Sequence, residues 1–119
     1  MLTANALCLA LNLFFEAGIE PPLAQEAVAH VTLNRARNTG ASICRTVFAP
    51  AQFSWTAHPW TYPQGKRWQQ SVLRAQAVLA HPKPDFTRGA WLYHRCDTPA
   101  WWRTRYQFVG QWGSHCFYR

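Results

Sequence analysis

Apolar residues in the first forty positions recur with the three-to-four-residue spacing of helices that pack against a core. This pattern predicts a helix over 3–17 that ends at Gly18, since glycine is common just past the last turn. After Pro21 and Pro22 a second helix is predicted over 23–37. The chain therefore opens with two consecutive core helices.

The remaining elements alternate between helical and extended patterns. They are predicted as a short helix over 42–48, an ordered loop over 51–65, an amphipathic helix over 66–81, a strand over 89–94, a helix over 99–108 and a strand over 113–119. The helix over 99–108 is inferred from Thr98 as an N-cap followed by Pro99 at the first helical position. The two strands are expected to pair. Residues 1–119 are thus predicted to be one domain, mainly α (α+β), with a small β-hairpin element.

Polar residues on the first helix share one face, because Asn5, Asn12 and Glu16 follow one another at spacings of seven and four. Glu16 is one of only five carboxylates and directly follows two phenylalanines. Apolar surroundings raise the pKa of a carboxyl group, which suits it to donate a proton near neutral pH. Periodicity alone favours a simpler alternative, a solvated glutamate on the polar face of an amphipathic helix. Glu20 and Glu26 have structural explanations as a loop acid and a partner of the helix dipole.

Composition restricts the class of partner. Twelve lysines and arginines against five acids give a net charge of +7, which favours a polyanion such as nucleic acid, anionic lipid or the bacterial wall. Aromatic residues make up 15% of the chain, and exposed rings stack equally on sugars and on nucleobases. No apolar run approaches the roughly 20 residues of a membrane span. No basic side chain precedes Arg35, so a cleavable signal peptide is not expected.

The histidines and cysteines do not form a recognised metal motif. No HxxxH, HExxH or CxxC spacing occurs, and no metal or other cofactor is expected. A Cys–His nucleophile pair stays open, because such partners meet only in space. The four cysteines are either separately buried thiols or two disulfides in an oxidising compartment, with three possible pairings.

Four sequence blocks, in order, resemble the spore-cortex-lytic (SleB/CwlJ-type) cell wall hydrolase family. These blocks are 16–20 with 25–35; 44–47 with 52–56; 89–90 and 93–94 with 99–101; and 113–119. Together they extend over nearly the whole chain. The resemblance implies a lysozyme-like helical domain with a small β-element beside a glycan-binding cleft.

The resemblance also implies a site. The first glutamate of the family signature, the catalytic acid, corresponds to Glu16. The expected cleft-lining residues are Gln52, Phe53, Ser54, Tyr93 and His94. The implied reaction cleaves the β-1,4 bond between N-acetylmuramic acid and N-acetylglucosamine, and the scarcity of acids fits a single-glutamate, lytic transglycosylase-like mechanism.

Three alternatives are kept. The nearest is a hydrolytic muramidase in which Glu20 or Glu26 supplies a second carboxylate. More distant are a metal-dependent muramyl-peptide amidase and a non-catalytic basic module that binds wall or nucleic acid.

The expected partner is the glycan strand of peptidoglycan, with no nucleic acid, no transmembrane segment and a monomeric protein. Action is expected in the periplasm or at the wall. The absence of a signal peptide suggests a bacteriophage lysis protein that is released through a membrane lesion. For the cysteines, the working prediction is Cys8 with Cys44 and Cys96 with Cys116.

Overall fold

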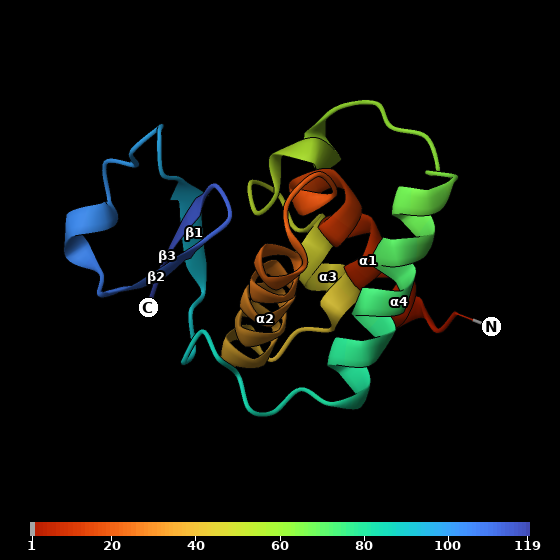
Figure 1. Ribbon diagram of the computed structural model, residues 1–119, viewed down its shortest axis with the longest axis horizontal. Helices are drawn as coiled ribbons and strands as arrows, with labels where there is room; N and C mark the ends of the chain where they lie inside the picture. The colour runs from red at the N-terminus through yellow and green to blue at the C-terminus, as the bar shows by residue number, and fades with distance from the viewer. Residues whose placement is uncertain (1) are drawn as a thin grey trace.

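The computed structural model describes residues 2–119 and shows a helical body with a small antiparallel sheet at one end (Figure 1). The helices are α1 (Ala4–Ala17), α2 (Pro22–Thr39), α3 (Ile43–Phe48) and α4 (Lys66–Ala80), with short 3₁₀ turns η1 (Ser54–Ala57) and η2 (Arg103–Arg105). The strands are β1 (Leu92–Arg95), β2 (Phe108–Trp112) and β3 (His115–Tyr118). The predicted mainly α class with a small β-element is confirmed.

Local signals account for the ends of the first two helices. The Thr3 hydroxyl caps α1 by accepting a hydrogen bond from the Ala6 amide at 3.1 Å. α1 ends at Gly18, where a Cβ atom would lie 2.5 Å from the Phe14 carbonyl oxygen, so only glycine fits. α2 ends at Gly40, whose φ of 69° lies in the left-handed region. Both predicted helices are confirmed to within two residues.

The core of the helical body surrounds α1. Leu9, Leu11 and Leu13 are fully buried, and α1 packs against all three other helices. The helices predicted over 42–48 and 66–81 are confirmed as α3 and α4. Within residues 2–119, no helix combines the length and the apolar character needed to cross a membrane.

The sheet has the strand order β1–β3–β2, with both pairs antiparallel. β1 pairs with β3 so that Tyr93 lies opposite Phe117, which confirms the predicted pairing of the strands near 89–94 and 113–119. The hairpin, however, is formed by β2 and β3. Strand β2 begins at Phe108, the last residue of the helix expected over 99–108, and its other residues had no predicted element.

The prediction of a helix over 99–108 is wrong. The Thr98 hydroxyl donates to the Asp97 carboxylate at 3.2 Å, and η2 is the only helical turn in the described part of this segment. Gln107 and Arg119 exchange two backbone hydrogen bonds of 2.9 Å, which start the β2–β3 ladder. Tertiary pairing with β3 therefore outweighs the local N-cap signal.

Both disulfides of the working prediction are present. Cys8 is bonded to Cys44, which joins α1 to α3, and Cys96 is bonded to Cys116, which joins the end of β1 to β3. The alternative of separately buried thiols is therefore wrong. One bridge therefore lies within the helical body and the other within the sheet.

Candidate active site

Glu16 lies in the last turn of α1, half-buried, and faces the sheet. The Tyr93 hydroxyl of β1 donates a hydrogen bond to Glu16 Oε1. This contact joins two residues 77 positions apart in the chain. It brings together the predicted catalytic acid and one of the predicted cleft residues.

Burial raises the pKa of the Glu16 carboxyl group above its usual value, because the charged form loses hydration. The hydrogen bond from Tyr93 and the positive charge of Arg35 act in the opposite direction but do not cancel this effect. Burial and the neighbouring carboxylate also raise the pKa of Tyr93 well above its usual value, so its hydroxyl stays a donor. The site thus holds a carboxyl group that keeps its proton to higher pH than an ordinary glutamate does.

Of the polar residues on one face of α1, Asn5 is exposed, whereas Asn12 and Glu16 lie against the rest of the fold. Asn12 is completely buried, donates to the Thr32 hydroxyl at 3.1 Å, and accepts from the Trp55 indole N–H at 2.8 Å. The Trp55 ring in turn stacks on Phe15 at 4.6 Å. Asn12 and the half-buried Glu16 are therefore not fully solvated, and the buried network around Asn12 supports the turn that carries Glu16.

Arg35 of α2 connects the helical body to the sheet. Its Nε donates to the Trp91 carbonyl oxygen at 2.7 Å and its Nη1 to the Gln52 carbonyl oxygen at 3.2 Å. The guanidinium also lies 4.8 Å from the centre of the Phe53 ring. A cation is thereby held close to Glu16 and Tyr93.

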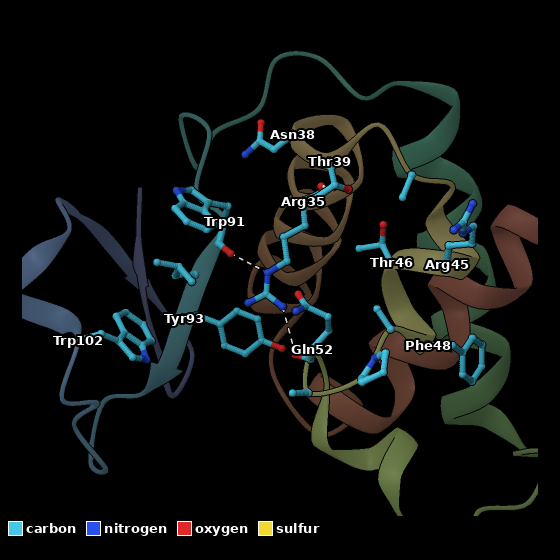
Figure 2. A pocket seen from close by; sticks show the side chains of 15 residues that line it. Arg35, Asn38, Thr39, Arg45, Thr46, Phe48, Gln52, Trp91, Tyr93 and Trp102 are labelled. Carbon is cyan, nitrogen blue, oxygen red and sulfur yellow. Dashed lines mark hydrogen bonds between the residues drawn. The ribbon is translucent and has the colours of Figure 1, made fainter.

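A groove of about 1050 Å³ opens between α2, α3 and β1, and Tyr93 lies on one of its walls (Figure 2). Its other lining residues are Arg35, Asn38, Thr39, Ala41, Arg45, Thr46, Phe48, Ala49, Pro50, Ala51, Gln52, Trp91, Leu92 and Trp102. Glu16 is not itself part of this lining. It adjoins the groove through the Tyr93 hydroxyl.

The five predicted cleft residues are placed differently. Gln52 and Tyr93 line the groove, and Ser54 is exposed at the start of η1 outside the lining. Phe53 is buried beneath Arg35. His94 points away from Tyr93 because neighbouring residues of a strand face opposite sides, and its Nε2 lies 2.8 Å from the Tyr118 hydroxyl. The structure therefore brings together Glu16, Tyr93 and Gln52, with Phe53 supporting Arg35.

The other candidate carboxylates contact other parts of the fold. Glu20 accepts from the Ser114 backbone N–H at 2.6 Å and lies 3.8 Å from His115 Nδ1. Glu26 lies 3.6 Å from the Arg74 guanidinium of α4. Within residues 2–119, no group of three or more His, Cys, Asp or Glu side chains is arranged to hold a metal ion.

Sequence reasoning did not single out Arg35, Trp91 or Trp102. In the sequence, Arg35 stands out only as the first basic side chain, although it belongs to the second half of the first family block. The two tryptophans belong to the aromatic surplus that predicted exposed rings in a groove. Their assignment to the groove needed the position of the sheet relative to α2.

A family model described as Cell Wall Hydrolase matches residues 19–118. That span includes Arg35 and Tyr93 and begins three positions after Glu16. No curated protein sequence matches the chain.

Two solved structures are similar over almost the entire chain, Glu16 included. The catalytic domain of the germination-specific lytic transglycosylase SleB from Bacillus anthracis has 26% identity and a TM-score of 0.77, with 99% of this chain and 97% of that chain covered. The catalytic domain of Bacillus cereus SleB has 26% identity and a TM-score of 0.74, with 100% and 93% covered. The expected lysozyme-like fold is confirmed. The chain therefore belongs to the cell wall hydrolase family and is a peptidoglycan-degrading enzyme.

Proposed function

We propose that this enzyme cleaves the β-1,4 bond between N-acetylmuramic acid and N-acetylglucosamine as a lytic transglycosylase, with Glu16 as its general acid and base. One observation carries the proposal. A half-buried glutamate with a raised pKa is held by a tyrosine hydroxyl at the wall of a large groove. Both similar solved structures are catalytic domains of SleB, and the Bacillus anthracis protein is described as a lytic transglycosylase.

In the first step, protonated Glu16 donates its proton to the glycosidic oxygen. The bond from the muramyl C1 to that oxygen breaks, the N-acetylglucosamine leaves with a new 4-hydroxyl, and positive charge develops on the muramyl ring. The raised pKa serves this step, because it keeps a larger share of Glu16 protonated at neutral pH. Tyr93 and Arg35 then stabilise the carboxylate that remains.

In the second step, the Glu16 carboxylate accepts the proton of the muramyl 6-hydroxyl. The 6-oxygen attacks C1 and closes a 1,6-anhydro ring, which restores protonated Glu16. An intramolecular nucleophile has a high effective concentration, so no second catalytic carboxylate is needed. Gln52 lies in the groove where its side chain can orient the sugar.

The placement of the other acids supports this scheme over a two-carboxylate hydrolysis. Glu20 contacts Ser114 and Glu26 contacts Arg74, and neither lines the groove. Mass spectrometry of digested peptidoglycan separates the two outcomes. Products that end in 1,6-anhydro-muramic acid support the proposal, whereas reducing muramic ends would establish the hydrolytic muramidase.

Glu16→Gln tests the assigned acid. We expect this substitution to lower the rate of glycan cleavage by about 10²–10⁴-fold, because the amide cannot transfer the proton. Binding to insoluble peptidoglycan should persist, since the amide oxygen can still accept from Tyr93. Glu26→Gln, which changes a carboxylate outside the groove, is the matched control and should retain activity.

Lysis by Glu16→Gln at the wild-type rate would contradict the assignment and favour another catalytic group. Release of stem peptides that stops on chelation would instead identify a metal-dependent amidase. If the wild type and Glu16→Gln both bind the wall and neither cleaves it, the result would support the non-catalytic binding module.

We also propose that the enzyme works outside the reducing cytoplasm, since its two disulfides persist in oxidising compartments. Five points stay predictions. They are a phage origin, release through a membrane lesion, a monomeric state, the absence of nucleic acid binding, and the assignment of residues 1–119 to a single catalytic domain.

A further inference from the structure

The groove extends well beyond the residues assigned to chemistry. From Tyr93 it passes Arg35 and continues to Arg45 and Phe48 on α3 (Figure 2). Its volume of about 1050 Å³ reaches the upper end of the roughly 300–1,000 Å³ that is usual for ligand pockets. It therefore has room for a chemical group in addition to the sugar at the scissile bond.

The charged side chains that line the groove are all positive. Two arginines, Arg35 and Arg45, belong to its described lining, and neither aspartate nor glutamate does. Arg35 already donates to the Trp91 and Gln52 carbonyl oxygens. Arg45 is exposed, and within residues 2–119 its guanidinium makes no hydrogen bond or ion pair. The groove thus presents a cation whose donors are available to a ligand.

An apolar surface accompanies this cation. Phe48 is 42% exposed and follows Arg45 by three positions, which places both side chains on one face of α3. The hydroxyls of Thr39 and Thr46 are already donated to backbone carbonyl groups of their own helices. The Phe48 ring also packs against Trp55 and Trp60, so the arm of the groove along α3 is a cation beside the exposed part of an aromatic cluster. The Cys8–Cys44 bridge joins this helix to α1.

The sugar rings of peptidoglycan are uncharged, whereas the peptide stems carry carboxylates between short apolar side chains. Resting on the function proposed above, we propose that Arg45 and Phe48 form a subsite for the peptide stem, in which Arg45 binds a stem carboxylate. The enzyme accordingly prefers glycan strands that still carry their peptides. Charge-assisted contacts of this kind give orientation as well as affinity.

The test compares three soluble preparations of the same glycan strands. The first carries native stems. The second carries stems whose carboxylates have been converted to neutral methylamides by carbodiimide coupling. The third has been treated with an amidase that removes the stems and leaves only the lactyl carboxylate on each muramic acid. Anhydro-muramic ends are counted by mass spectrometry over time, and kcat and KM are determined separately.

We expect Arg45→Gln to lower kcat/KM on native strands by about fivefold, the size of a solvent-exposed charge pair, chiefly through KM. On methylamide strands, kcat/KM of the wild type should also fall by about fivefold. The wild type and Arg45→Gln should then differ in kcat/KM by no more than about twofold. Arg67→Gln on α4 removes an exposed charge outside the groove and is the matched control. It should follow the wild type on all three substrates.

Equal rates of the wild type on native and methylamide strands would overturn the proposal, as would an equal loss for Arg45→Gln and Arg67→Gln. A difference between wild type and Arg45→Gln that persists on amidase-treated strands would assign Arg45 to the lactyl carboxylate instead. These results differ from a failure of the proposed function, in which the wild type would form no anhydro ends on any of the strands.

Discussion

At the scale of single residues, opposing influences set the protonation of Glu16. Burial raises its pKa, while the Tyr93 hydroxyl and the Arg35 guanidinium lower it. A carboxyl group with burial alone would hold its proton too tightly to act as a base, and one with a stronger cation would not act as an acid. Tyr93 and Arg35 therefore matter to both steps of the proposed reaction.

Tyr93→Phe should show this balance in a pH profile. The tyrosine hydroxyl favours the carboxylate form, so its removal raises the pKa of Glu16 further. The acid is active when protonated and is lost as the pH rises through its pKa, so the alkaline limb of kcat against pH should move to higher pH. The maximal rate should fall by about tenfold or more, because the carboxylate loses a donor.

Tyr62→Phe is the control, since Tyr62 is exposed and lies outside the groove lining. It should leave both the limb and the maximal rate unchanged. A Tyr93→Phe profile whose alkaline limb moves to lower pH would contradict the role given to the hydroxyl.

At the scale of elements, the β2–β3 turn is attached to the corner between α1 and α2. The Glu20 carboxylate accepts from the Ser114 amide, and a Cβ atom on Gly113 would lie 2.4 Å from Glu20 Oε1. Gly113 also has a φ of 58°, so both conformation and close approach require glycine there. His115, which follows Ser114, packs edge-on against Tyr93, with 5.1 Å between the ring centres. Glu20 thereby helps to place the tyrosine that contacts Glu16.

Glu20→Ala should lower the free energy of unfolding by about 1–3 kcal/mol, because the half-buried Ser114 amide loses its acceptor. Activity should fall with it as Tyr93 becomes less well positioned. Glu20→Gln keeps an acceptor and should recover most of both quantities. Urea denaturation and glycan cleavage measure the two effects.

Glu26→Ala is the comparison for Glu20→Ala. It breaks only a partly exposed ion pair with Arg74 and should cost below about 1 kcal/mol. A fully inactive but stable Glu20→Gln would instead indicate that Glu20 is a catalytic carboxylate, as in the hydrolytic alternative.

At the scale of the whole molecule, one disulfide cross-links the helical body and a second cross-links the sheet, so each side of the groove carries a covalent link. Cys8–Cys44 joins α1, which carries Glu16, to α3, which carries Arg45. Cys96–Cys116 joins the strand that carries Tyr93 to the centre of the sheet. A chain of this size has a modest core, so cross-links contribute a large share of its net stability.

Replacing each cysteine pair by alanine should lower the free energy of unfolding by about 2–4 kcal/mol, since each bridge restricts the unfolded chain. The Cys8–Cys44 pair should cost more, because it closes a separation of 36 residues against 20 for Cys96–Cys116. Urea denaturation of the two double variants, with and without reductant, provides the measurement. A wild-type midpoint that reductant leaves unchanged would contradict the expectation.

Much of the helical body could be predicted from local pattern. The ends of α1 and α2 depend on Thr3, Gly18 and Gly40, whose effects operate within one turn. Strand β2 could not be predicted in this way. Its residues adopt a strand because β3 offers a partner, and the apparent cap at Thr98 competes with that pairing and is overridden.

The candidate site likewise has one part that the sequence identifies and another that only the tertiary structure shows. Scarcity of carboxylates, two preceding phenylalanines and the family blocks identified Glu16 from the one-dimensional chain, because each is a property of neighbouring residues. The half-burial of Glu16 depends on how the sheet packs against the helices. The same packing decides that Tyr93, and not His94, contacts Glu16. Contacts across 77 positions, like the one between these two side chains, arise from packing and leave no periodic trace in the sequence.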